Sequence, residues 1–287
     1  MKPEIDEVTG VATTGHEWDG IKELNKPLPK WWLLTFYATI IWSIGYWVVY
    51  PAWPLANSYT KGIWNYSQRA TVAAEVQAGK EAQAGMRDLL DKTPLADVRK
   101  NPELLRFASA AGAASFQTNC APCHGRGAQG FIGYPNLNDD DWIWGGTVDQ
   151  IYKTIEFGIR SGHESAHASA MPRFGLDKML DDDKINDVAE YVLSLSGKAD
   201  DKAAAERGTA IYKAECVTCH AEDGKGSLEQ GAPNLVDGIW LYGGSKAQIV
   251  ESIRTGRGGS MPAWGPRLDP TTVKSLAVYV HSLGGGK

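Results

Sequence analysis

All four cysteines of this 287-residue sequence fall in two copies of one short pattern. The copies are Cys120-Ala-Pro-Cys123-His124 and Cys216-Val-Thr-Cys219-His220. The pattern C-x-x-C-H is typical of covalent c-type haem attachment. Two thiols three positions apart lie on one helical turn, so both can form thioethers with the porphyrin, and the adjacent histidine then lies beneath the ring. The sequence therefore predicts two covalently bound haem c groups, each with a histidine ligand to its iron.

The sequence around the two motifs is duplicated as well. A glycine stands eight residues before the first cysteine of each copy, and an aromatic residue stands four before it. The later matches are Pro135–Leu137 with Pro233–Leu235, Trp142–Gly146 with Trp240–Gly244, and Met171–Gly175 with Met261–Gly265. Each copy ends in an amphipathic helical pattern. Two tandem copies of one small α-helical domain explain the duplication best.

Other uses of paired cysteines fit the sequence less well. Structural zinc sites usually have their two C-x-x-C pairs about 15–20 residues apart, whereas 92 residues separate Cys123 from Cys216. A thioredoxin-like redox pair needs a βαβ context, and both copies have helical patterns. Disulfide bonds would not explain the histidine after each pair. Haem attachment is therefore the favoured interpretation of all four cysteines.

Each copy also offers one methionine at an equivalent position, Met171 and Met261, and a proline follows each. Iron held by histidine and methionine is the cytochrome c arrangement, in which the soft thioether stabilises ferrous iron. We therefore expect His124, Met171, His220 and Met261 to ligate the two irons. The spacing leaves open whether each methionine serves the haem of its own domain or the two are exchanged.

The first copy carries eight more residues than the second before its methionine. This insertion contains His163 and His167, which at positions i and i+4 could share a helix face and bind a metal, or replace Met171 on the iron. We favour a polar, exposed loop. Arg160 and Arg257 follow the repeated glycines, and we expect them to pair with haem propionates.

An uncharged segment near the N-terminus predicts a membrane anchor. No charged residue occurs from Trp31 to Thr60, and the part from Trp31 to Tyr50 is 20 residues long. As a helix rising ~1.5 Å per residue it spans about 30 Å, the thickness of the hydrocarbon core of a bilayer. A buried core helix rarely stays uncharged for so long, and a cleavable signal peptide would start nearer Met1. An uncleaved anchor ended by Pro51 is the best interpretation.

Charge sets the orientation and limits the partners. Lys22, Lys26 and Lys30 flank the N-terminal side of the anchor, which by the positive-inside rule puts the N-terminus in the cytoplasm. The net charge of −5 argues against nucleic acid as a partner. The expected fold class is all-α, with one transmembrane helix followed by two tandem class I cytochrome c domains. We divide the chain into a cytoplasmic N-terminal tail (1–30), a transmembrane anchor (31–53), a helical linker (54–106) and two cytochrome c domains (107–197 and 198–287).

With its anchor followed by two C-x-x-C-H domains, the chain resembles the dihaem subunit of cbb3-type cytochrome c oxidases, the CcoP/FixP family, also called subunit III. The resemblance spans almost the whole chain. It includes the N-terminal DGIKELNKPLPKWW, the helix FYATIIWSIGYWVVYPAWP, and both haem repeats with their Met-Pro motifs. The N-terminal piece is the most specific, because generic dihaem cytochromes have no reason to carry it. Some members of the family have two anchoring helices, whereas this sequence has a single predicted span.

The resemblance implies a location and a set of partners. The chain would lie in a bacterial inner (cytoplasmic) membrane, with its anchor in membrane lipid and its haem domains in the periplasm. It would accept electrons from a soluble cytochrome c and pass them toward a haem–copper catalytic subunit, beside a monohaem cytochrome c subunit. Oxygen reduction and proton pumping would occur in the catalytic subunit, and we nominate no catalytic residue in this chain.

Two other functions remain as alternatives. The chain could be a free-standing, membrane-tethered dihaem electron shuttle between a quinol-oxidising complex and a reductase. It could also be a haem gas sensor or a peroxidase, but such a protein needs an open coordination position on its iron. Met171 and Met261 weigh against that second alternative, because with them both irons are fully coordinated.

Overall fold

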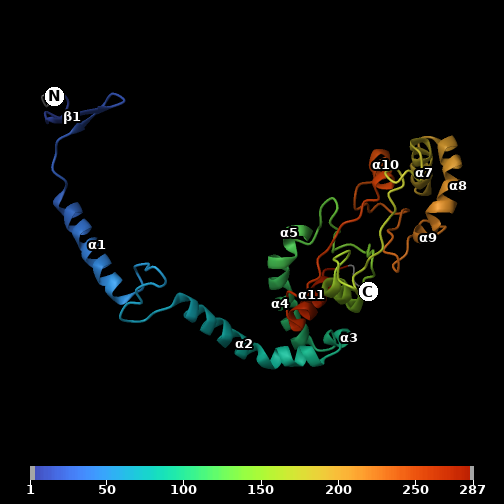
Figure 1. Ribbon diagram of the computed structural model, residues 1–287, viewed down its shortest axis with the longest axis horizontal. Helices are drawn as coiled ribbons and strands as arrows, with labels where there is room; N and C mark the ends of the chain where they lie inside the picture. The colour runs from blue at the N-terminus through green and yellow to red at the C-terminus, as the bar shows by residue number, and fades with distance from the viewer. Residues whose placement is uncertain (1–3, 285–287) are drawn as a thin grey trace. The chain divides into compact units, whose positions relative to one another are not determined.

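The computed structural model describes residues 4–284 of the chain. The chain divides into two compact units, residues 1–82 and 83–287, and each is described by itself. The first unit contains β1 (Thr13–Trp18), β2 (Ile21–Leu24), α1 (Lys30–Val49) and most of α2 (Gln68–Lys92). The end of α2 and the remaining helices belong to the second unit (Figure 1): α3 (Leu95–Val98), α4 (Pro102–Asn119), α5 (Ala121–His124), α6 (Val148–Phe157), α7 (Asp182–Leu195), α8 (Lys202–Glu215), α9 (Val217–His220), α10 (Lys246–Thr255) and α11 (Pro270–His281).

The predicted anchor is the helix α1. In the part of the chain that the structure describes, it is the one helix long and apolar enough to cross a membrane, and none of its residues is buried. It begins one residue before the predicted anchor (31–53) and ends at Val49, so residues 50–53 of that anchor lie outside the helix. The amide of Tyr50 closes the last turn on the carbonyl of Tyr46 at 2.8 Å, and Pro51 then prevents the helix from continuing.

The N-terminal tail contains a β-hairpin that the sequence analysis did not predict. Strands β1 and β2 pair antiparallel, with Trp18 opposite Ile21. Asp19 and Gly20 form the two-residue turn, and both have positive φ angles, +49° and +84°. This is the backbone that a type I′ turn requires, and Asp-Gly is a preferred sequence for it.

Side-chain N-caps stand at the start of several helices of the second unit, and equivalent caps occur in both repeats. Thr147 begins α6 and Ser245 begins α10, each in a capping box with a glutamine three residues later. Pro102 is the first residue of α4. The side chain of Asn101 accepts hydrogen bonds from the amides that follow it, so the proline stands where a helix tolerates it.

In the second unit, the last helix of each sequence repeat packs on helices of the other repeat. The last helix of the second repeat, α11, packs on α4 and α6 of the first repeat. The last helix of the first repeat, α7, packs on α8 and α10 of the second. Figure 1 shows α11 beside α4, and α7 beside α8. We call α3, α4, α5, α6 and α11 the first lobe, and α7, α8, α9 and α10 the second lobe.

Each lobe has its own hydrophobic core, built from both repeats. The first core includes Leu104, Phe116, Ile151, Ile155 and Leu276, and the second includes Ile185, Val192, Tyr212, Ile249 and Ile253. Leu90 at the end of α2 also belongs to the first core, which fixes the linker to that lobe. The sequence repeats therefore exchange their last helices when they fold.

Two glycines permit the exchanged helices to cross closely. A Cβ added to Gly112 in α4 would overlap the carbonyl oxygen of Ser275 in α11. A Cβ added to Gly208 in α8 would overlap the carbonyl oxygen of Asp187 in α7. These are the glycines that stand eight residues before each C-x-x-C-H motif. Their repetition in the sequence therefore reflects one helix crossing that is used twice.

Candidate haem sites

Each C-x-x-C-H motif forms a single helical turn at the end of a longer helix. Cys120 ends α4 and begins α5, and Cys216 does the same for α8 and α9. In each motif the amide of the histidine donates to the carbonyl of the first cysteine at 2.9 Å. This bond places the two cysteines and the histidine on one turn, as the spacing predicted. All four cysteine thiols are free.

The two histidines are held in one tautomer by their surroundings. Nδ1 of His124 lies 3.1 Å from the carbonyl oxygen of Pro135, and Nδ1 of His220 lies 3.1 Å from that of Pro233. Because a carbonyl only accepts, Nδ1 must carry the hydrogen, which leaves the lone pair of Nε2 available to a metal. Burial lowers the pKa of both imidazoles, so both are neutral near pH 7. The proline carbonyls of the repeated Pro-Asn-Leu segments thus orient both candidate histidine ligands.

Burial disfavours the thiolate form of the first cysteine in each motif. Burial, with a smaller contribution from the neighbouring cysteine, raises the pKa of Cys120 to about 11. The pKa of Cys216 is also raised to about 11, chiefly by burial. Zinc ligation and nucleophilic attack both need the thiolate. Within residues 4–284 no group of three His, Cys, Asp or Glu side chains is arranged to hold a metal ion.

The two candidate methionine ligands lie in exchanged positions. Met261, from the second repeat, packs against the core of the first lobe, which also contains Cys120. Met171, from the first repeat, packs against the core of the second lobe beside Cys216. The packing therefore places each methionine in the lobe that contains the C-x-x-C-H motif of the other repeat. This bears on the choice that the sequence spacing left open.

Backbone contacts hold the exchanged methionine segments. The amide of Met261 donates to the carbonyl of Ile159, and the amide of Ile159 donates to the carbonyl of Met261, both at 2.9 Å. Gly158 and Gly256 have positive φ angles of +76° and +61°, and a Cβ on either would overlap the methionine carbonyl of the other repeat. In the sequence these glycines show only that Arg160 and Arg257 follow equivalent positions of the two repeats. Their role at the crossing needed the tertiary structure.

The histidines of the insertion contact residues of their own repeat. The ring of His167 stacks on Trp144 with centroids 4.1 Å apart, and its Nε2 lies 3.1 Å from Oγ1 of Thr154. Nδ1 of His163 accepts a hydrogen bond from the amide of Ser165 at 3.0 Å. These contacts support the loop interpretation over a metal site or an iron ligand, although both side chains are half-buried rather than exposed.

The two arginines predicted to meet propionates are engaged by backbone oxygens. Nε of Arg160 donates to the carbonyl of Gly259 at 2.7 Å, so this side chain links the segments that cross between the lobes. Arg257 donates to the carbonyl of Gln248, and its guanidinium lies 4.7 Å from the ring centre of Tyr242. A propionate contact stays a prediction for both arginines.

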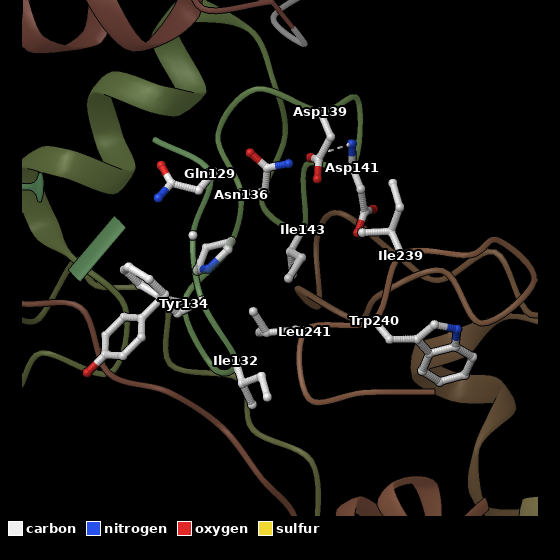
Figure 2. Close-up of a pocket in the computed structure, with 13 residues that line it drawn as sticks. Gln129, Ile132, Tyr134, Asn136, Asp139, Asp141, Ile143, Ile239, Trp240 and Leu241 are labelled. Carbon is white, nitrogen blue, oxygen red and sulfur yellow. Dashed lines mark hydrogen bonds between the residues drawn. The ribbon is translucent and has the colours of Figure 1, made fainter. Parts of the chain in front are cut away.

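A pocket of about 180 Å³ lies between equivalent loops of the two repeats, lined by residues 129–143 of the first and 239–241 of the second. Figure 2 shows Asp139 and Asp141 at one end of it, with Ile239 beside them. Burial, followed by the charges of Asp237 and Asp139, raises the pKa of Asp141 to about 6. The carboxylates of the acidic run Asp139–Asp141 thus meet a carboxylate of the second repeat, Asp237.

Two family models match the chain. One describes the N-terminal domain of the cbb3 cytochrome oxidase protein FixP and matches residues 10–57. The other describes subunit III of cbb3-type cytochrome c oxidase and matches residues 108–192 and 203–280. The second model thus matches each of the two repeats separately.

Relatives of known name resemble the chain over nearly its full length. The cbb3-type cytochrome c oxidase subunit FixP of Azorhizobium caulinodans is 56% identical over 284 residues, which are 99% of this chain and 96% of the relative. FixP of Bradyrhizobium diazoefficiens is 56% identical over 285 residues, 99% and 98% of the two chains. CcoP of Cereibacter sphaeroides is 49% identical over 288 residues, 100% and 99% of the two chains.

Proposed function

Because the chain belongs to the CcoP/FixP family of membrane-anchored cytochrome c subunits of cbb3-type oxidases, we propose that it carries two haem c groups and passes single electrons. The electrons come from a soluble cytochrome c and go toward a haem–copper subunit that reduces oxygen. A monohaem cytochrome c subunit lies beside the chain in the same complex. The single observation that carries the proposal is the pair of matched sites, each with a C-x-x-C-H turn and a methionine from the other repeat.

The donor sets fit two haem c groups. Cys120 and Cys123 form the thioethers in the first lobe, where His124 and Met261 ligate the iron. Cys216 and Cys219 form those of the second lobe, where His220 and Met171 are the ligands. The free thiols, the neutral imidazoles with an available Nε2 and the packed methionines all support this assignment. When bound, each haem supplies reversible one-electron chemistry at its iron.

The protein residues set the conditions for that electron transfer. The proline carbonyls hold the histidines in the ligating tautomer and increase their basicity. The methionine thioethers stabilise ferrous iron and raise the reduction potential. With a histidine and a methionine available to each iron, the donor sets would leave no free position for oxygen or peroxide, which supports an electron carrier over a gas sensor or peroxidase.

The anchor bears on the location and orientation of the chain in the membrane. We infer a single pass through a bacterial inner membrane by α1, with the N-terminus in the cytoplasm and the haem lobes in the periplasm. The uncharged helix and the lysines before it support this orientation. Oxygen reduction and proton pumping then belong to the catalytic subunit, and this chain contributes no catalytic residue.

Gentle solubilisation of the native membrane tests the proposal against the free-standing shuttle. An affinity tag on this chain should retain a haem–copper subunit and a monohaem cytochrome c in constant ratio through two further columns. The retained complex should consume oxygen when it is supplied with reduced soluble cytochrome c. Recovery of this cytochrome alone, with all oxidase activity in other fractions, would favour the free-standing shuttle instead.

A further inference from the structure

The loop of residues 51–66, between α1 and α2, folds back onto the C-terminal end of α1. The amide of Ile63 donates to the carbonyl of Val48 at 3.0 Å, and the amide of Trp64 donates to that of Val49 at 3.2 Å. Carbonyls in the last turn of a helix have no partner within the helix, so the loop supplies one. Gly62 has a φ of +70°, and a Cβ there would overlap the carbonyl of Val49. The loop is thus joined to the end of the helix by a contact that requires glycine.

The loop also satisfies much of its own backbone. Oγ1 of Thr60 accepts from the amides of Ala52 and Trp53 at 3.3 and 3.0 Å, and the amide of Thr60 donates to the carbonyl of Trp53 at 3.0 Å. The amide of Leu55 donates to the carbonyl of Ser58 at 2.7 Å. A segment with internally paired backbone groups can enter a medium poor in water at little cost.

The outer surface of this loop is apolar and aromatic. Six large side chains are 40–74% exposed: Trp53, Leu55, Tyr59, Ile63, Trp64 and Tyr66. Ring contacts fix several of them to the helix end, with centroids 4.9 Å apart for Trp47 and Trp53 and 4.9 Å apart for Tyr50 and Trp64. Lys61 is the only charged residue in the segment 51–66. We call these six side chains the aromatic collar.

We propose that the aromatic collar lies in the lipid headgroup region of the bilayer, so that the anchor consists of α1 and a folded interfacial loop. The proposal rests on α1 crossing the membrane, as proposed above. A 20-residue helix spans about 30 Å, so the last carbonyls of α1 lie at the boundary of the hydrocarbon core. A loop hydrogen-bonded to Val48 and Val49 must lie at that same depth.

The chemistry of the collar fits phospholipid headgroups. Four of the six side chains are Trp or Tyr, whose rings pack among the upper acyl chains while their polar tips reach water and headgroups. Lys61 places one cation at the level of the lipid phosphates. The collar thereby fixes the depth and the rotation of α1, which an uncharged helix of nearly uniform apolar character does not fix by itself.

Spin labels in the full-length protein with its haems attached test this placement. The native cysteines are then bonded to haem, so a label reacts only with an introduced cysteine. The three variants are Ile63→Cys in the collar, Ile41→Cys in the middle of α1 and Val76→Cys in α2, all at exposed positions. Each is reconstituted in phosphatidylcholine vesicles, and electron paramagnetic resonance measures the accessibility of the label to oxygen and to a water-soluble nickel chelate.

We expect the ratio of oxygen to nickel accessibility at position 63 to lie several-fold above that at position 76 and below that at position 41. Equal ratios at positions 63 and 76 would place the collar in water and overturn the proposal. A label at position 63 that neither reagent reaches would mean that protein covers the collar, which also overturns it. An aqueous label at position 41 would instead refute the membrane span itself, so the two failures are distinguishable.

Discussion

At the scale of single residues, the two methionine segments are held by contacts between residues that come from different repeats. Met261 pairs its backbone with Ile159 at 2.9 Å in both directions, and Gly158 leaves room for that approach. Gly256 leaves the same room for Met171. In the proposed haem sites, the glycine of one repeat would therefore fix where the methionine of the other repeat is presented.

The exchange of methionines can be tested with a protein that carries one haem. Replacing Cys216 and Cys219 by alanine should leave only the first haem, with its iron–sulfur charge-transfer absorption intact. In that background we expect Met261→Leu to abolish the absorption, because it removes the thioether ligand, and Met171→Leu to leave it unchanged. The absorption spectrum of the oxidised protein is the measurement. If Met171→Leu alone removed the band, each methionine would serve its own repeat.

At the scale of secondary structure elements, each lobe depends on one close helix crossing. The crossings are α4 with α11 and α8 with α7, and a glycine stands at each point of contact. The aromatic residue four positions later packs on a tyrosine of the partner helix, with ring centroids 5.4 Å apart for Phe116 and Tyr279 and 4.8 Å apart for Tyr212 and Tyr191. The same contacts therefore occur in both lobes, although the partner helix always comes from the other repeat.

The glycine contact predicts a lobe-specific loss of stability. A methyl group added by Gly112→Ala would push α11 away from α4, and overpacking of this kind costs about 1–3 kcal/mol. Guanidinium unfolding of the full-length protein in detergent, followed by haem absorbance, should show the first lobe unfolding earlier and the second unchanged.

A matched control for Gly112→Ala is Gly85→Ala in α2, where an added Cβ meets nothing within 4 Å. Alanine is the better helix former at such a site, so stability should stay the same or rise by about 0.5–1 kcal/mol. Equal destabilisation by both changes would mean that helix propensity, and not the crossing, is what Gly112 serves.

At the scale of the whole molecule, the exchanged helices tie the two lobes into one unit. The peptide links between lobes run through residues 158–181 and 256–269, and equivalent loops of the two repeats meet beside the pocket of Figure 2. There the amide of Gly133 donates to the carbonyl of Leu241 at 2.8 Å. Three carboxylates, Asp139, Asp141 and Asp237, share this junction, and their mutual repulsion opposes it when they are charged.

This junction predicts a stability that falls as pH rises. The folded protein holds the pKa of Asp141 at about 6, above the unfolded value of about 3.9. The contribution is therefore fully present below about pH 4 and is lost as pH rises through 6. Asp141→Asn should stabilise the protein at pH 7 by about 1 kcal/mol, after allowance for solvent screening of this half-exposed group.

The measurement is the free energy of unfolding between pH 4 and pH 7, compared for the original chain and the variant. The control is Asp140→Asn, because Asp140 is exposed and its substitution changes the net charge by the same amount. The slope should flatten in Asp141→Asn and stay unchanged in Asp140→Asn. Parallel curves for all three proteins would contradict a role for the carboxylates at the junction.

Features that depend on residues close together in the chain could be predicted from the sequence alone. The C-x-x-C-H spacing is a property of one helical turn, so Cys120, Cys123 and their repeat could be predicted as haem attachment residues from the sequence alone. The length of α1 follows from the bilayer thickness, and its start was predicted to within one residue. The hairpin at Asp19 and Gly20 was not predicted, although the Asp-Gly dipeptide is typical of a type I′ turn.

Only the tertiary structure decided which helix packs on which motif. Spacing along the chain is identical whether Met171 stays with its own repeat or crosses to the other. Crossing depends on the links between the repeats and on close approaches at Gly158 and Gly256, which join residues about 100 positions apart. Such contacts leave no local pattern, and so the two repeats were evident in the sequence while their exchange was not.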